Sequence, residues 1–221
     1  DKLPELSNYL GASENEKMAI VSHLKSNLNP DDYSDEMTKS TLASIYAMKS
    51  IQEQNGEFGS NRYIISNCES AIQIMETFAL FRLCNWENPL VDIIPLFEVI
   101  DDLQKAHLIM EQLYTNETYL NHIKNRGNKQ TVMLGFSDGT KDGGYLMANW
   151  SIYKAKENIT TMSRKYGIKV VFFDGRGGPP ARGGGKTHKF YASLGSNIEN
   201  EQIQITVQGQ TISSNFGTLD S

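Results

Sequence analysis

Two short runs of apolar residues place the strongest constraint on the fold of this chain. They are Ile93-Ile94-Pro95-Leu96-Phe97 and Val170-Val171-Phe172-Phe173. A strand with one face in water alternates apolar and polar residues, whereas a continuously apolar strand is buried on both faces, as in a parallel sheet covered by helices. The two runs therefore predict the parallel sheet of an α/β protein.

From about residue 60 onward the sequence repeats the order strand, loop, helix. We predict strands at 62–66, 91–97, 131–136, 168–173 and 202–207, and helices at 69–84, 99–114, 142–166 and 187–194. This repetition is βαβ architecture, either doubly wound or barrel. Only about five strands fit, whereas a complete eight-stranded barrel takes around 250 residues. The alternatives are an open sheet or a section of a larger barrel.

The first part of the chain has the spacing of helices. Ser13-Glu14-Asn15-Glu16 is typical of a capping box, and a second helix is predicted from about Ser34 to Asn55. The apolar residues expected to face inward are Met18, Ile20, Val21, Leu24 and Leu28 in the first helix, and Met37, Leu42, Ile45, Met48 and Ile51 in the second. We therefore divide the chain into a helical segment, 1–57, and an α/β segment, 58–221.

Composition excludes several classes of function. The net charge is −5 and 39% of the residues are hydrophobic, which argues against a general nucleic-acid or membrane binder. No apolar run approaches the roughly 20 residues that cross a bilayer. The first residues lack the pattern of a secretion signal, so we expect a cytoplasmic protein. Cys68 and Cys84 have no metal-ligand spacing and are expected to be buried, reduced thiols.

Polar residues gather where the predicted strands end. Right-handed crossovers place the C-terminal ends of parallel strands at one edge, where α/β proteins bind ligands. For any single carboxylate, a helix cap is an equally good explanation. For the whole set, one shared site is the better explanation. The set is Asn67, Glu69, Glu98, Asp138, Lys141, Asp174, Arg176, Arg182 and Gln208.

Two of the loops at this edge have the composition of an anion and metal site. The loop after Phe173 is rich in glycine, including Gly177 and Gly178, and carries Arg176 and Arg182. Glycine allows the backbone to approach a ligand closely, and arginine binds phosphate or carboxylate oxygens. In the loop 137–144, Asp138 would join Glu98 in holding Mg²⁺ or Mn²⁺, and Lys141 would add positive charge. The predicted ligand is a small phosphorylated anion bound beside this divalent ion.

The motifs at these strand ends resemble those of phosphoenolpyruvate carboxylase, in the same order. They are Pro95-Leu96-Phe97-Glu98 with Asp101-Asp102-Leu103, Gly135-Phe136-Ser137-Asp138 with Lys141-Asp142, Gly175-Arg176-Gly177-Gly178 with Arg182-Gly183-Gly184, and Val207-Gln208-Gly209. The resemblance covers about residues 62–217.

The resemblance implies a partial (β/α)₈ TIM-type barrel section with about five parallel strands, preceded by N-terminal helices. The family joins bicarbonate to phosphoenolpyruvate, releasing oxaloacetate and phosphate, with Mg²⁺ or Mn²⁺. It implies Glu98 and Asp138 as metal ligands, Arg176 with Gly177 and Gly178 at the phosphate, Arg182 at bicarbonate, and Lys141 beside the reacting groups. The parent enzyme is expected to be a homo-oligomer.

The sequence also departs from the family pattern. Asp174 stands where the family commonly has histidine, Gly139-Thr140 precede Lys141, and Pro179-Pro180-Ala181 stiffen the glycine-rich loop. Because the family's catalytic histidine and several arginines belong to other segments, we expect this section alone to be inactive. Two alternatives are a small metal-dependent phosphate-handling lyase or phosphotransferase on an open sheet, and a scaffold that dimerises through exposed sheet edges.

Overall fold

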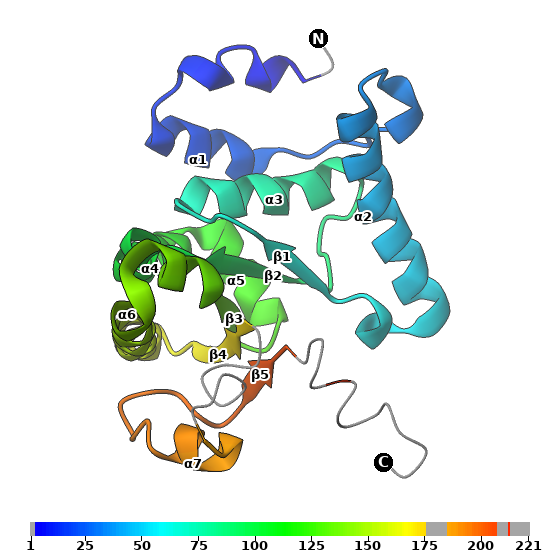
Figure 1. Ribbon diagram of the computed structural model, residues 1–221. Coiled ribbons are helices and arrows are strands. Elements are labelled where there is room, and N and C mark those ends of the chain that lie inside the picture. Colours follow the sequence, from blue (N-terminus) through cyan, green and yellow to red (C-terminus); the bar gives the residue numbers. More distant parts are fainter. Residues whose placement is uncertain (1–2, 176–184, 207–211, 213–221) are drawn as a thin grey trace. The chain divides into compact units, whose positions relative to one another are not determined.

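The computed structural model describes residues 3–175, 185–206 and 212 of the chain. The strands form one five-stranded sheet with the order β1-β2-β3-β4-β5 (Figure 1). They are β1 (Arg62–Ile65), β2 (Asp92–Phe97), β3 (Lys129–Leu134), β4 (Lys169–Asp174) and β5 (Ile203–Ile205). Pairing is parallel between β2 and β3, β3 and β4, and β4 and β5. The predicted α/β fold with about five parallel strands is confirmed.

The strand order distinguishes the two architectures that the sequence left open. In a doubly wound sheet the order reverses at a switch point, where the ligand binds. Here each strand is followed in the sheet by the next strand of the sequence, as around an eight-stranded α/β barrel. The sheet is therefore a section of a TIM-type barrel and does not close on itself.

The three central strands are buried as the apolar runs predicted. β2, β3 and β4 each contain three consecutive buried residues. Burial of consecutive residues means that both faces of these strands are covered. β1, by contrast, alternates between exposed and partly buried residues. The third strand begins at Lys129 and ends at Leu134, earlier at both ends than the predicted range 131–136. It cannot extend to Phe136, because that residue already has helical backbone angles.

The helices are α1 (Glu14–His23), α2 (Glu36–Asn55), α3 (Ala71–Leu83), α4 (Ile100–Thr115), α5 (Glu117–Asn125), α6 (Ser137–Lys165) and α7 (Thr187–Ala192) (Figure 1). Short 3₁₀ helices lie at Pro4–Leu6, Tyr9–Gly11, Pro30–Asp32 and Glu57–Gly59. Helix α5 has no counterpart among the predicted elements. The prediction of a loop at residues 137–144 was wrong, because these residues begin α6. Gly144 interrupts that helix with φ 80° and ψ 170°.

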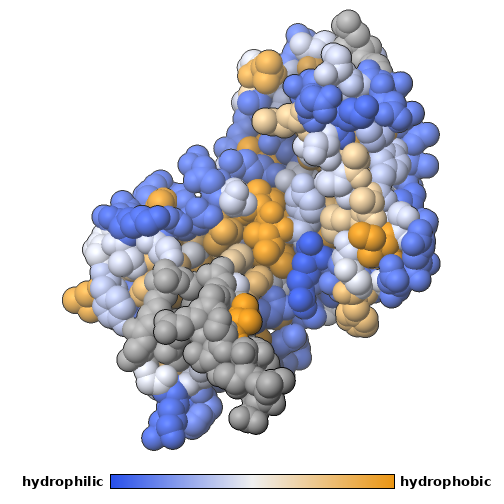
Figure 2. Space-filling model, turned by 45° about the vertical axis from the view of Figure 1, so that its right-hand side comes forward, coloured by the Kyte–Doolittle hydropathy of each residue, from blue (hydrophilic) through white to orange (hydrophobic). Residues whose placement is uncertain are grey.

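Residues of the chain group into two compact units, and the first contains residues 1–63, 70–93 and 113–127. The Ser13 capping box is present, because the Ser13 hydroxyl accepts from Glu16 N–H and Glu16 accepts from Ser13 N–H. The helix ends at His23, however, so Leu24 and Leu28 are buried in extended chain rather than in the helix. Met37 and Ile51 were expected to face inward and are 79% and 39% exposed. Figure 2 shows that apolar residues (orange) do reach the surface.

Two buried groups in the first unit titrate abnormally. Cys84 is fully buried, and burial raises the pKa of its thiol to about 11. His122 packs against the rings of Phe78 and Tyr119. Its burial, and then the charge of Arg126, lower the pKa of His122 to about 4. Cys68 belongs to the second unit and is also buried. Neither cysteine forms a disulfide within the described residues, which fits the prediction of buried, reduced thiols.

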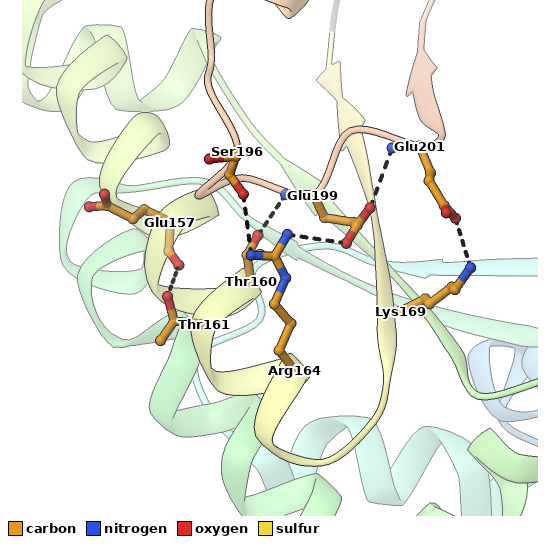
Figure 3. A network of polar contacts seen from close by, with 8 residues as sticks. All are labelled: Glu157, Thr160, Thr161, Arg164, Lys169, Ser196, Glu199 and Glu201. Carbon is orange, nitrogen blue, oxygen red and sulfur yellow. Dashed lines mark hydrogen bonds and ion pairs between the residues drawn. The ribbon is translucent and has the colours of Figure 1, made fainter.

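The second unit contains residues 64–69, 94–112 and 128–221. At the N-terminal end of β4, polar contacts fasten the connection that leads from α7 to β5 (Figure 3). Arg164 of α6 donates to the carbonyl of Ser196 at 3.3 Å and pairs with Glu199, whose N–H donates to the Thr160 hydroxyl. These contacts lie at the end of the strand opposite to the predicted site. In α/β barrels, the residues at that end contribute to stability rather than to catalysis.

Candidate active site

Glu98 follows the last residue of β2 and lies beside the end of β3. The parallel register pairs Phe97 with Leu134, and the N–H of Gly135 donates to the carbonyl of Phe97 at 2.8 Å. A Cβ atom on Gly135 would lie only 3.1 Å from Cα of Glu98. The absence of a side chain at Gly135 therefore permits the backbone of Glu98 to lie this close. Glu98 is partly exposed, and none of the described residues forms a hydrogen bond or ion pair with its carboxylate.

Asp138 lies in the first turn of α6 rather than in a loop. Gly139, the next residue, is buried, and a Cβ there would be 3.3 Å from the carbonyl oxygen of Glu98. The first turn of α6 is thus packed against the residue that follows β2. The Nζ atom of Lys141 lies 2.9 Å from Oδ1 of Asp138, and both side chains are substantially exposed. The structure brings Glu98 and the Asp138–Lys141 pair to the same edge of the sheet.

A side-chain cap connects α4 and α6 at this edge. The N–H of Ile100, the first residue of α4, donates to Oδ2 of Asp142 at 3.1 Å. Gly143 allows close contact as well, because a Cβ there would lie 3.1 Å from Cγ1 of Ile100. An aspartate that accepts from a helix N-terminus satisfies a donor that has no partner within the helix. Asp142 therefore fixes α6 relative to the turn that carries Glu98.

The neighbouring part of the edge is also acidic. The Asn67 amide donates to Oε1 of Glu69 at 3.2 Å, just beyond the end of β1. Asp102 is 6% exposed, and Oδ2 of its carboxylate has no hydrogen-bond partner within the described ranges. Its burial, and next the Glu69 carboxylate, raise the pKa of Asp102 above its ordinary value. Negative potential at this edge favours a bound cation.

Asp174, the last residue of β4, is the centre of a buried network that sequence reasoning missed. Its Oδ2 atom accepts from Lys156 Nζ at 2.7 Å and from the Tyr191 hydroxyl at 2.6 Å. All three side chains are nearly excluded from solvent. Burial, followed by the Asp174 charge, raises the pKa of Tyr191 well above its ordinary value. One signal was present in the sequence, because Lys156 lies in helical phase with the apolar residues Ile152 and Ile159.

The remaining predicted site residues lie outside the described part of the chain. These are Arg176, Gly177, Gly178, Arg182 and Gln208. Two flanking glycines are described. A Cβ on Gly175 would lie 3.2 Å from the carbonyl oxygen of Leu134, and Gly185 has φ +89°. The close contact at Gly175 favours a residue without a side chain. The backbone angle at Gly185 favours a residue that readily adopts left-handed backbone angles. His188 is exposed in the first turn of α7.

The carboxylates at the edge fit a partly protein-bound divalent ion. Among the residues that the structure describes, no three His, Cys, Asp or Glu side chains form a complete metal cage. Magnesium commonly takes one or two carboxylates and completes its shell with water and substrate phosphate. Glu98, whose carboxylate has no partner among the residues at 3–175, 185–206 and 212, and the exposed Asp138 fit that requirement.

Among the described helices, none has both the length and the apolar composition of a membrane-spanning segment.

Comparison with known proteins finds one family. The family model described as phosphoenolpyruvate carboxylase matches residues 1–221. The chain is 35% identical to phosphoenolpyruvate carboxylase of Corynebacterium efficiens, covering 97% of the chain and 25% of that protein. It is 38% identical to phosphoenolpyruvate carboxylase 3 of Sorghum bicolor, covering 96% of the chain and 22% of that protein.

A third relative, phosphoenolpyruvate carboxylase of Nitrosomonas eutropha, is 36% identical over 84% of the chain and 20% of its own length. The chain thus spans about a quarter or less of the curated relatives that it matches. The family model covers the α/β residues and the N-terminal helices alike. This chain belongs to the phosphoenolpyruvate carboxylase family.

Proposed function

We propose that this chain is the part of a cytoplasmic phosphoenolpyruvate carboxylase that binds the divalent ion and the phosphate of phosphoenolpyruvate. The whole enzyme would join bicarbonate to phosphoenolpyruvate, giving oxaloacetate and phosphate. Family membership favours this function over a small phosphate-handling lyase or phosphotransferase, because the match extends over the whole chain. The observation that carries the proposal is the position of Glu98 beside Gly135 and Gly139, next to Asp138.

Each residue at the edge has a distinct part in the proposal. Glu98 and Asp138 would hold Mg²⁺ or Mn²⁺, which when bound would offset the negative charge of the phosphorylated substrate. Lys141 adds a positive charge beside Asp138, and its side chain is exposed at the edge where an anion would bind. Asp142 keeps the first turn of α6 against Ile100. Electrostatic stabilisation by groups already in place is usually the largest part of such catalysis.

Two arginines complete the proposed anion site. By their motif positions, Arg176 would hold the phosphate and Arg182 would place bicarbonate. A guanidinium group suits both anions, because its planar donors match pairs of oxygen atoms. The support for these roles is the family resemblance of the motif, together with the position of Gly175 beside the end of β3.

Manganese binding to the 221-residue chain tests the metal site. Isothermal titration calorimetry should show that Glu98→Gln and Asp138→Asn each weaken Mn²⁺ binding about tenfold or more, since even the outer partners of a metal site contribute that much. Asp101→Asn is the matched control, because Asp101 is an exposed carboxylate of the same edge that is paired with Lys105. Equal affinity in all four proteins would rule out Glu98 and Asp138 as the ligands.

We further propose that the isolated chain lacks carboxylase activity. Oxaloacetate formation from phosphoenolpyruvate and bicarbonate is followed by coupling it to malate dehydrogenase. No turnover above the uncatalysed reaction is expected from the chain, with or without Mn²⁺. Turnover that Asp138→Asn abolishes would show instead that these residues suffice for the reaction.

A further inference from the structure

We infer that Asp102 is a positioning residue of the divalent-ion site, which fixes the backbone beside Glu98 and adds a negative charge that strengthens binding of the ion. The inference rests on the proposed function, because it assigns a further residue to that same site. All the residues that carry it belong to the second compact unit.

The Asp102 carboxylate is buried and incompletely hydrogen-bonded. Asp102 is 6% exposed and lies in the first turn of α4, a helix that begins two residues after Glu98. Within the described ranges, its Oδ2 atom has no hydrogen-bond partner. Buried polar atoms are nearly always hydrogen-bonded, and the exceptions are characteristic of catalytic groups and of sites that bind an ion.

A second carboxylate makes the charge of Asp102 harder to accommodate. Burial, and next the Glu69 carboxylate, raise the pKa of Asp102 above its ordinary value. Glu69 belongs to the segment that follows β1, where the N–H of Cys68 donates to the carbonyl of Leu96 in β2 at 3.2 Å. The backbone next to Glu69 is thus fastened to the strand that leads into Glu98 and α4.

The nearby lysine does not neutralise Asp102. Lys105 favours the charged form of Asp102, but it has the smallest effect of the charged groups around that carboxylate. Its ammonium group is paired instead with the exposed carboxylate of Asp101. A buried carboxylate without a counterion is destabilising, and a nearby cation favours its charged form. An ion held at Glu98 would supply that positive charge.

The other oxygen of Asp102 supports the backbone next to Glu98. The N–H of Val99 donates to the Asp102 carboxylate, as in a capping box, where the third residue of a helix binds the N-cap N–H. The following N–H, that of Ile100, donates to Asp142 of α6 at 3.1 Å. The two residues after Glu98 therefore each have an N–H bonded to a carboxylate, which holds this turn in place.

Asp102→Asn separates the two contributions. The asparagine carbonyl can still accept from the N–H of Val99, whereas the negative charge is lost and an amide donor takes the place of Oδ2. This variant should be more stable than the wild type, because it removes a buried charge and its repulsion by Glu69. A side chain that lowers stability where a neutral one would fit is typical of a functional site. Asp102→Ala removes both contributions.

Urea unfolding of the 221-residue chain without metal tests the unfavourable charge. The unfolding midpoint of Asp102→Asn should be higher than that of the wild type. Asp101→Asn is the matched control, because it neutralises the adjacent carboxylate, which is exposed and paired with Lys105, and its midpoint should stay close to the wild-type value. A lower midpoint for Asp102→Asn would show that its charge serves the fold, and would overturn the inference.

Calorimetric titration of the same proteins with Mn²⁺ tests the contribution to the ion site. Asp102→Asn should bind Mn²⁺ roughly tenfold more weakly than the wild type and Asp101→Asn, as when an outer partner of a metal site is removed. Asp102→Ala should bind more weakly still, because the turn after Glu98 also loses its hydrogen bond. A role in the fold alone would lower stability and affinity together, whereas the inferred role moves them in opposite directions in Asp102→Asn.

The titration also separates the inference from the proposed function. If Glu98→Gln loses Mn²⁺ affinity and Asp102→Asn binds like the wild type, the inference fails and the proposed metal site stands. Equal affinity in Asp102→Asn and Asp102→Ala would refute the support that Asp102 gives to the backbone beside Glu98. A wild-type chain that binds no Mn²⁺ would refute the proposed metal site and the inference with it.

Discussion

Lys156 Nζ lies 2.7 Å from Asp174 Oδ2, and the two side chains retain only 3% and 5% of their exposed surface. A second lysine of the same unit, Lys169, makes an ion pair of similar length, 2.8 Å, with Glu201, but these side chains are 66% and 69% exposed. The two pairs share chemistry and differ in solvent access. They therefore allow the effect of burial on an ion pair to be measured within one molecule.

Lys156→Met should destabilise the chain by about 3–5 kcal/mol, because it leaves the Asp174 carboxylate buried without its cation. Urea unfolding, followed by circular dichroism and by the fluorescence of Trp86 and Trp150, measures the change. Lys169→Met should leave the unfolding midpoint almost unchanged, because water screens an exposed pair. Similar midpoints for the two variants would contradict this explanation.

The burial of His122 should make the folded chain less stable as the pH is lowered from about 6.5 to about 4. Its pKa is about 4 in the folded chain and 6.5 without the protein environment. Between these values the unfolded chain binds the proton and the folded chain does not, so acid favours unfolding by up to roughly 3 kcal/mol. His122→Gln should remove this part of the pH dependence in urea titrations. His23→Gln, at an exposed position, should retain it.

Gly135→Ala should destabilise the second unit by about 1–3 kcal/mol, as extra atoms do in a closely packed region. The added carbon would lie 3.1 Å from Cα and 3.3 Å from Cγ of Glu98, so Mn²⁺ affinity should fall together with stability. Gly11→Ala is the control, because no atom lies within 4 Å of the added carbon there. Calorimetric metal titration of both variants would reject the packing argument if Gly135→Ala bound Mn²⁺ like the wild type.

Both thiols should react with 5,5′-dithiobis(2-nitrobenzoate) only when the chain opens. Cys68 and Cys84 are 0% exposed, and burial raises the pKa of Cys84 to about 11, so the reactive thiolate is scarce at neutral pH. The reaction should be slow in buffer and release two equivalents of chromophore in 6 M guanidinium chloride. Fast labelling of the native chain at neutral pH would contradict the burial of both side chains.

The sheet could be predicted from the sequence because its central strands are short, continuously apolar and separated by helical spacing. The first residues of α6 were harder to predict. Gly139, Gly143 and Gly144 have low helix propensity, and the sequence therefore favoured a loop. In the structure Gly139 and Gly143 pack against the chain at Glu98 and Ile100, so tertiary contact outweighs local preference. Met37 was also misplaced, because its helical phase pointed inward although its side chain is 79% exposed.

The candidate site was predictable in part. The position of Glu98 beside the end of β3 could be predicted, because neighbouring parallel strands end at a common edge of the sheet. The partnership of Lys156, Asp174 and Tyr191 could not, since it joins residues from three elements whose side-chain directions depend on the packing of α6 and α7. No local pattern reports such a contact. Asp174 was noticed as a departure from its family, but its buried partners were visible only in the structure.

The break at Gly144 divides α6 into two helical segments. The first segment carries Asp138 and Lys141, and the second carries Lys156. Each segment is held by its own contacts, the first by the hydrogen bond from Ile100 N–H to Asp142 and the second by the buried pair of Lys156 and Asp174. Because Gly144 turns the chain between the two segments, Asp138 stands in a direction that an unbroken helix through Lys156 would not allow.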